Sequence, residues 1–233
     1  MKLEKEIQEY VRSFAGLSKQ SVKERDILHG TTILALKYKN GVVVAGDCRM
    51  CFNPTLIGSE NFKKLFKIDE DSVIAVAGSV APAMELIRFL RAEVDIYNRT
   101  QTHRLSFEGK ANLVSRILAK FAPLASAGIV VLPIYASRNK IYGYDYLGAR
   151  YEVKYLAVGS GSQQALTYLD SNWNEELSKF QAVKIAVAAL NLAYQRNPQT
   201  GKVKLVYIIE DEIVEIDSEK ISKIEEGDKN VQL

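Results

Sequence analysis

The sequence predicts an α+β protein built as a four-layer αββα sandwich, with two antiparallel sheets between two layers of helices. Segments with strand character occur in runs, and pairs of segments with helical periodicity separate these runs. Runs of strands and runs of helices, in place of strict alternation, favour antiparallel sheets with helices on their outer faces. No linker or internal repeat divides the sequence. We therefore expect one domain, over residues 31–233.

Residues 1–30 differ from the rest of the chain because they are charged at first and then polar. Apolar side chains recur near the start at helical spacing, at Leu3, Ile7, Tyr10, Val11 and Phe14. This spacing predicts a short amphipathic helix before the domain begins.

The first two strands are predicted at 31–38 and 42–47. Asn40-Gly41 lies between them and is typical of a type I′ hairpin turn, in which both central residues have positive φ. Such a turn would put Thr31 opposite about Met50. Asp47 would then lie within one or two residues of Thr31. The sequence does not decide to which face of the sheet the Asp47 side chain points.

The later elements follow from the same two periodicities. Strands are predicted at 64–68, 72–78, 128–137, 140–147, 150–159, 202–209 and 212–217. Helices are predicted at 82–98, 107–124, 162–172 and 175–196, and the last dozen residues are expected to form a polar tail.

The composition is that of a soluble globular protein, since 47% of the 233 residues are hydrophobic and 25% are charged, with a net charge of +3. Dispersed basic residues disfavour nucleic acid as a partner. No apolar run approaches the roughly 18 residues of a membrane-spanning helix, and the N-terminus lacks the apolar core of a secretory signal. Two cysteines cannot build a disulfide framework, which favours a reducing cytoplasm.

The common catalytic motifs find little support. The two histidines, His29 and His103, are expected to be surface residues rather than members of a triad. The C-x-x-C pair of Cys48 and Cys51 follows a strand and has no second pair to complete four metal ligands, so we expect no metal or redox site. The stretch VGSGSQQ at 158–164 lacks the third glycine of a dinucleotide loop and indicates a close backbone turn.

The candidate site of chemistry is Gly30-Thr31, at the mouth of the first apolar strand. Glycine weakens a strand but suits a cleavage junction. Scission after Gly30 would give Thr31 a free α-amine, and a threonine activated by its own amine is a known nucleophile. The amine has a pKa near ~8, so it can accept the hydroxyl proton at neutral pH. A lysine would lower that pKa and a carboxylate would orient the lysine. Lys64 and Asp47 are the candidates.

Several motifs resemble the β subunits of the 20S proteasome, which are N-terminal nucleophile hydrolases. They are HGTTILAL (29–36), AGDCRM (45–50), KKLFKID (63–69) and AVAG (75–78). Three more are similar to the bacterial, actinobacterial type: LSFEGKANLVSRIL (105–118), YDYLGARYE (144–152) and YLAVGSGS (155–162). The resemblance extends from Thr31 to about Asp217.

The resemblance implies that residues 1–30 are a propeptide and that Thr31 is both nucleophile and general base. Asp47 and Lys64 would tune it, with Lys63 as the alternative lysine. The other implied catalytic positions are the Gly78 N–H as oxyanion donor, Ser160 as support for the amine, Asn197 and Thr200. Arg49 is a further candidate, because the predicted hairpin places it as close to Thr31 as Asp47. Asn197 stands where the family usually has an aspartate.

An apolar P1 pocket is also implied, lined by Met50, Phe62, Phe66, Val76, Val80 and Met84. Cys51 lies where the family aligns substrate with its backbone. An apolar lining implies cleavage after hydrophobic residues, because a charged side chain would be desolvated there without a partner.

The function implied is a threonine-type endopeptidase subunit, self-processed between Gly30 and Thr31, which needs no cofactor and works in the cytoplasm. Its implied partners are α subunits and other β subunits in stacked heptameric rings, an ATP-dependent unfoldase ring, and unfolded protein or peptide substrates. Two alternatives stay open. One is a weak or silent β-type subunit with an assembly role, and the other is a different amidase of the N-terminal nucleophile class.

Overall fold

The structure is a computed structural model that describes residues 2–14, 31–53, 56–228 and 231–233. Its helices are α1 (Lys2–Phe14), α2 (Val80–Thr100), α3 (Phe107–Ala125), α4 (Ser162–Asn172), α5 (Lys179–Arg196) and α6 (Ser218–Glu225). One sheet contains β1 (Thr32–Tyr38), β2 (Gly41–Asp47), β10 (Tyr155–Gly159), β11 (Lys204–Ile209) and β12 (Ile213–Ile216). The second contains β5 (Leu65–Lys67), β6 (Ser72–Gly78), β7 (Val131–Ser137), β8 (Ile141–Tyr144) and β9 (Arg150–Val153). A separate hairpin joins β3 (Met50–Asn53) and β4 (Leu56–Ser59).

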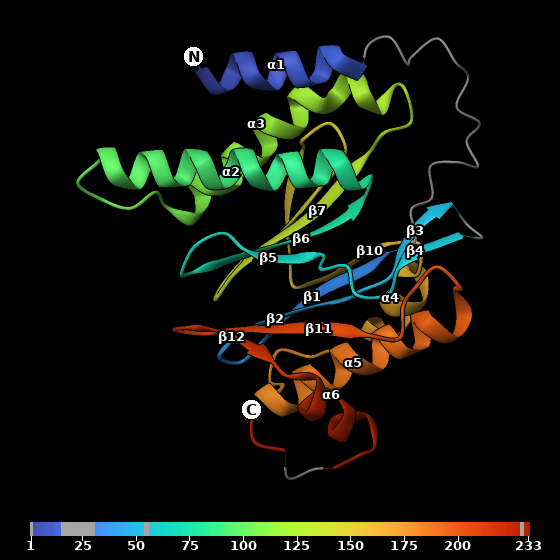
Figure 1. Cartoon of the computed structure of the whole chain (residues 1–233). Coiled ribbons are helices and arrows are strands. Elements are labelled where there is room, and N and C mark those ends of the chain that lie inside the picture. The colour runs from blue at the N-terminus through green and yellow to red at the C-terminus, as the bar shows by residue number, and fades with distance from the viewer. Residues whose placement is uncertain (1, 15–30, 54–55, 229–230) are drawn as a thin grey trace.

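The two five-stranded sheets face each other between two helix layers (Figure 1). The strand orders are β10-β1-β2-β11-β12 and β5-β6-β7-β8-β9, and the neighbouring strands are antiparallel. Helices α4 and α5 cover the outer face of the first sheet, and α2 and α3 cover that of the second. The predicted αββα sandwich is confirmed.

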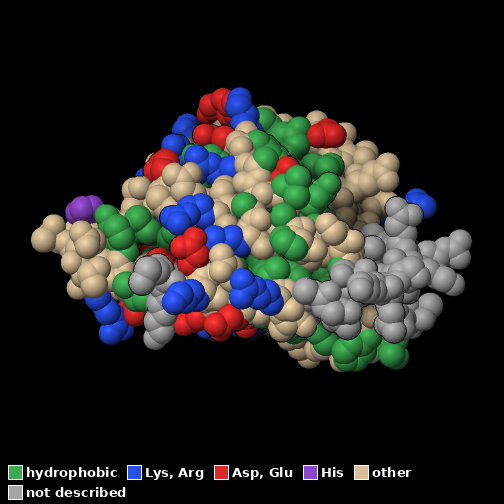
Figure 2. All heavy atoms as spheres, turned by 90° about the horizontal axis from the view of Figure 1, so that it is seen from above, with side chains coloured by type: hydrophobic (Ala, Val, Ile, Leu, Met, Phe, Trp, Pro, Cys, Tyr) green, Lys and Arg blue, Asp and Glu red, His purple; other side chains and the backbone are tan. Residues whose placement is uncertain are grey.

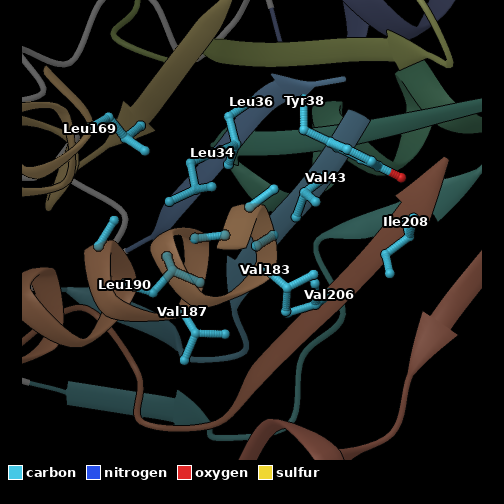
Figure 3. Close-up of a cluster of buried hydrophobic side chains, with 14 of the residues drawn as sticks. Leu34, Leu36, Tyr38, Val43, Leu169, Val183, Val187, Leu190, Val206 and Ile208 are labelled. Carbon is cyan, nitrogen blue, oxygen red and sulfur yellow. The ribbon is translucent and has the colours of Figure 1, made fainter. Parts of the chain in front are cut away.

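The central strands are buried on both faces because each lies between a helix layer and the other sheet. Along β1, Leu34 and Leu36 join Val187 of α5 in one apolar cluster (Figure 3). Ile33 and Ala35 point the other way and pack between the two sheets. This alternation has the period of two expected of a strand. It fixes the orientation of the end of β1 from which the site is built.

Helix α1 is the predicted amphipathic helix, and it packs against α3. Ile7 is 1% exposed, and the ring of Tyr10 lies 5.8 Å from that of Phe121. The Glu4 carboxylate lies 3.0 Å from the Lys120 ammonium. Seen from above this layer, acidic and basic side chains are intermixed on the surface (Figure 2). In the described ranges, no helix has the length and apolar character needed to span a bilayer.

The β1–β2 turn differs from the prediction. Tyr38 pairs with Gly41, so Lys39 and Asn40 form the turn. Positive φ occurs at five glycines of the described chain, and Gly41 is not among them, so the type I′ assignment is wrong. A Cβ atom at Gly41 would lie 2.2 Å from the Ile209 carbonyl oxygen, which explains the glycine by the close approach of β11.

This pairing changes the register at the open end of the hairpin. Ile33 pairs with Gly46, two positions away from the register that the Asn40-Gly41 turn would set. Each side chain keeps its face because the shift is even. Thr31 is therefore closer to Asp47 than expected, and not opposite Met50.

The structure differs from the predicted elements at four further places. The predicted strand 150–159 breaks at Lys154, with β9 in the second sheet and β10 in the first. The predicted helix 175–196 begins at Lys179, because Ser178 and Gln181 form a capping box that starts it there. The β3–β4 hairpin was not predicted, and α6 occupies part of the expected polar tail, capped by Asp217.

Candidate active site

A buried ion pair joins the end of β2 to the start of β5. The Lys64 ammonium lies 2.9 and 3.0 Å from the two Asp47 carboxylate oxygens. The side chains are 3% and 0% exposed. Burial lowers the pKa of Lys64, and the Asp47 charge opposes that shift. The pair can persist in this position only if the remaining carboxylate lone pairs are also satisfied.

Backbone donors supply those bonds to Asp47. Oδ1 accepts the N–H groups of Arg49 at 2.8 Å and Gly201 at 2.9 Å. Oδ2 accepts the Thr32 N–H at 2.6 Å. The carboxylate is thus held from three segments of the chain, and it in turn orients the lysine.

The two adjacent lysines differ in burial and in partner. The Lys63 side chain is 61% exposed and its ammonium lies 3.6 Å from Glu215. Lys64 alone of the two points inward to Asp47, the geometry required of the predicted lysine.

Thr31 lies at the mouth of β1 and is 5% exposed. Its N–H donates to Ser160 Oγ at 3.3 Å, and the Ser160 N–H donates to the Thr31 carbonyl oxygen at 2.8 Å. The atom that would become the α-amine after scission therefore already faces Ser160. Gly30 and His29 lie outside the described residues, as does the rest of 15–30.

The close turn predicted in VGSGSQQ holds this contact. Gly159 has a φ of +110°, and a Cβ atom there would lie 2.0 Å from the Thr31 carbonyl oxygen. Only glycine tolerates both the left-handed backbone and the approach. The turn thereby brings Ser160 against the start of β1.

Three other predicted residues have partners away from Thr31. Asn197 caps α5, and its Oδ1 accepts the Gln199 N–H at 2.8 Å. The Thr200 hydroxyl lies 2.8 Å from that of Thr32. The guanidinium of Arg49 binds Glu60 and the Pro198 carbonyl oxygen, so Arg49 reaches Asp47 through its backbone and not its charge.

An apolar pocket opens beside Thr31 and Lys64. Its other lining residues are Met50, Cys51, Phe62, Val76, Ala77, Gly78, Val80, Ala83 and Met84. Six of the predicted substrate-binding residues are therefore gathered there, and Phe66 is not. Leu65 and Phe66 point to opposite faces of β5, and Phe66 packs in the cluster beneath α2, with the Arg91 guanidinium 6.0 Å from its ring.

Gly78 forms the wall of this pocket where β6 leads into α2. Its φ is +99°, and a Cβ atom there would lie 2.2 Å from the Val130 carbonyl oxygen. The next residue, Ser79, donates its N–H to the same carbonyl at 2.8 Å. The close packing on β7 fixes the backbone around Gly78.

The two cysteines of the C-x-x-C pair, Cys48 and Cys51, are buried and not joined by a disulfide. Burial raises the pKa of Cys48 to about 11 and also raises that of Cys51. Thiols held protonated in this way are poor nucleophiles. Cys51 contributes to the pocket wall.

The sequence analysis missed Thr32, Gly161 and Gly201. Thr32 bonds Asp47 through its N–H and Thr200 through its hydroxyl. A Cβ atom at Gly161 would lie 2.4 Å from the Thr32 Oγ1. A Cβ atom at Gly201 would lie 2.7 Å from the Arg49 Cβ. The doubled threonine and the glycines of GSGS and QTG were the available signals, but their meaning depends on contacts between distant segments.

The four-layer sandwich, with strands β1 and β2 leading to this pocket, is the fold of the N-terminal nucleophile hydrolases. A family model described as proteasome subunit matches residues 27–209. The chain belongs to the proteasome subunit family.

Three relatives are named as proteasome beta subunits. A proteasome subunit beta of Acidimicrobium ferrooxidans is 36% identical over 206 residues, which cover 85% of this chain and 75% of the relative. One of Jonesia denitrificans is 35% identical over 207 residues, covering 86% and 68%. Proteasome subunit beta 2 of Pyrococcus furiosus is 36% identical over 187 residues, covering 79% and 89%. The predicted resemblance to β subunits is confirmed.

Proposed function

We propose that this chain is the precursor of a threonine-type endopeptidase subunit of a proteasome core, cut between Gly30 and Thr31. The observation that carries the proposal is the burial of Thr31 in the lining of an apolar pocket that Lys64, the ion-pair partner of Asp47, also lines. One cavity then contains the nucleophilic hydroxyl of Thr31, the Lys64 ammonium that lowers the pKa of the α-amine, and a binding site for an apolar side chain.

Maturation begins when the Thr31 hydroxyl attacks the carbonyl carbon of Gly30. The peptide C–N bond breaks, the threonine nitrogen takes up the hydroxyl proton, and an ester is left. Water then hydrolyses the ester, which frees the hydroxyl beside the α-amine already released and leaves a carboxylate on Gly30. Residues 1–30 leave as the propeptide, including α1.

In the mature enzyme the α-amine takes the hydroxyl proton as Oγ1 attacks a substrate carbonyl. The Lys64 charge lowers the pKa of the amine and keeps it neutral near pH 7. The Gly78 N–H stabilises the tetrahedral oxyanion. The protonated amine then gives its proton to the leaving amine. Water hydrolyses the acyl-enzyme, and no cofactor enters any step.

The pocket favours cleavage after hydrophobic residues. Among the described residues that line it, Lys64 alone is charged, and its charge is committed to Asp47. A charged substrate side chain would lose its hydration there without gaining a partner.

The proposed setting is the cytoplasm, in stacked heptameric rings with α subunits and other β subunits. An ATP-dependent unfoldase ring would deliver unfolded protein or peptide substrates. Family membership implies assembly with other proteasome subunits. Confinement inside such an assembly would protect folded proteins.

A second candidate is a weak or silent β-type subunit with an assembly role. Asn197 favours it, because an uncharged amide at the end of α5 binds a backbone N–H of its own loop. The Thr200 hydroxyl is likewise bonded to Thr32. Proton handling around Thr31 would be slower if these side chains do not assist it.

The N-terminal sequence and mass of the purified assembly test the proposal. We expect chains that begin at Thr31 and hydrolyse apolar fluorogenic peptides, with inhibition by an epoxyketone that captures both the hydroxyl and the amine. Thr31→Ala should keep its leader and lose hydrolysis, whereas Thr167→Ala, on the exposed face of α4, should behave as wild type. Intact leaders in wild type would favour the silent subunit. Processed chains that hydrolyse only small amides would indicate a different amidase.

A further inference from the structure

Thr32, the residue after the proposed nucleophile, joins three distant parts of the chain. Its N–H donates to Asp47 Oδ2 at 2.6 Å at the end of β2. Its Oγ1 accepts the Gly161 N–H at 3.2 Å and bonds the Thr200 hydroxyl at 2.8 Å. The Thr32 and Thr200 residues are both 0% exposed. A single buried side chain therefore links the turn before α4 to the loop after α5.

The same turn and loop hold the reacting residue and its ion pair. The turn supplies the Ser160 N–H to the Thr31 carbonyl oxygen at 2.8 Å. The loop supplies the Gly201 N–H to Asp47 at 2.9 Å. Any shift of the turn relative to the loop would move Thr31 relative to Asp47.

The Gly161 backbone packs closely on the Thr32 hydroxyl and leaves no space for a side chain at position 161. A Cβ atom at Gly161 would lie 2.4 Å from Thr32 Oγ1 and 2.8 Å from Thr200 Oγ1. A methyl in place of the hydroxyl keeps the volume but leaves the Gly161 N–H and the Thr200 hydroxyl without this partner. A buried polar group left without a partner is destabilising, which favours a displacement of the turn or the loop that restores a bond.

We propose that Thr32 is a positioning residue for the reaction at Thr31, acting through its hydroxyl bonds to Gly161 and Thr200. The inference rests on the proposed peptidase function and extends it to a group that touches no substrate. Its side chain sets where the turn and the loop meet, and hence where Thr31 lies relative to Asp47 and its partner Lys64. Small misplacements of reacting groups are costly in rate.

The experiment compares Thr32→Val, which removes the hydroxyl at constant volume, with Thr32→Ser, which keeps it. Thr200→Val removes the partner hydroxyl from the other side. The matched control is Tyr135→Phe, which breaks the buried bond from the Tyr135 hydroxyl to Ser72 Oγ at 2.8 Å in the second sheet. For each purified assembly, the fraction of chains beginning at Thr31, the kcat and KM per processed chain, and the unfolding temperature are measured.

We expect Thr32→Val to lower kcat by about tenfold or more with little change in KM, because positioning and not binding is lost. Thr32→Ser should stay near wild type. Thr200→Val should also lower kcat, but by less, because the bond from the Gly161 N–H to the Thr32 hydroxyl remains. The double variant should lose little more than Thr32→Val, since both single variants remove the one shared bond. Tyr135→Phe should lower the unfolding temperature but leave kcat unchanged.

A wild-type kcat in processed Thr32→Val would overturn the inference. So would a Thr32→Ser variant as slow as the valine, or an equal loss of kcat in Tyr135→Phe, since either would indicate a general packing effect. If Thr32→Val does not fold, an unchanged kcat in Thr200→Val overturns it instead. Failure of the proposed function looks different, because wild type itself would then show neither scission nor hydrolysis.

Discussion

Asp47→Asn tests the electrostatic core of the site. The amide keeps an oxygen acceptor for the N–H groups of Arg49 and Gly201, which lie 2.8 and 2.9 Å from Asp47 Oδ1 in the wild type. It removes the charge that faces the buried Lys64 ammonium at 2.9 and 3.0 Å. Burial already lowers the pKa of Lys64, and the carboxylate is what opposes this. In the variant the pKa of Lys64 should therefore fall further.

The cost has an upper bound. Forcing a lysine with an ordinary pKa of about 10.4 to be neutral at pH 7 costs about 4.6 kcal/mol, since each pH unit is worth about 1.36 kcal/mol. Removing one partner of a buried ion pair costs about 3–5 kcal/mol in other proteins. We expect Asp47→Asn to lose at least about 3 kcal/mol of unfolding free energy at pH 7, and no more than the bound above.

The sign of the pH dependence follows from proton counting. Where Lys64 is neutral in the folded variant, the unfolded chain binds more protons than the folded one. Stability of the variant then rises with pH up to the ordinary lysine pKa. The deficit against wild type should shrink by up to about 1.4 kcal/mol per unit between pH 7 and pH 9.

The assay is urea unfolding at several pH values, with Thr31→Ala in every chain so that no scission occurs. Glu60→Gln is the control, because Glu60 is 44% exposed in its pair with Arg49 and should cost less than about 1 kcal/mol without a pH slope. Adding Lys64→Met to Asp47→Asn should recover stability at pH 7. A deficit that is flat with pH, or smaller than that of Glu60→Gln, would refute the reasoning.

Three further predictions concern the leader, the turn and the pocket. Ile7→Asp should destabilise the uncut chain by about 2–5 kcal/mol, because this buried side chain anchors α1, and thermal unfolding of processed protein should be unaffected. Gly159→Ala should abolish scission, as measured by mass, because its Cβ would lie 2.0 Å from the Thr31 carbonyl oxygen; Gly227→Ala, with a φ of +90° but nothing within 4 Å, should be processed normally. Met84→Glu should lower kcat/KM for apolar peptides by about tenfold or more, because an unpaired carboxylate in the pocket is costly. Retained preference for apolar peptides in Met84→Glu would argue against this pocket.

The local pattern of the sequence determined most elements of the fold and pointed to Thr31 as the candidate nucleophile. Alternation gives β1 and β2, helical spacing gives α1 to α5, and the order of runs gives the sandwich. Gly30-Thr31 stands out because a glycine at the mouth of an apolar strand has no good structural reason. These signals can be recognised in the sequence because hydrophobic periodicity and the conformational preference of glycine depend on only a few neighbouring residues.

The tertiary structure alone decided which side chains meet. The hairpin register was wrong by two residues because Gly41 serves the approach of β11 and not a left-handed turn. Lys64 differs from its neighbour Lys63 in being buried against Asp47. Phe66 lies outside the predicted pocket because its side chain points from β5 toward α2. Such contacts join residues far apart in the chain, and their energies depend on desolvation and on which sheet edge pairs with which. No local pattern encodes desolvation or the pairing of sheet edges. The fold could therefore be predicted from the sequence, whereas the hydrogen bonds and the ion pair around Thr31 could be seen only in the folded chain.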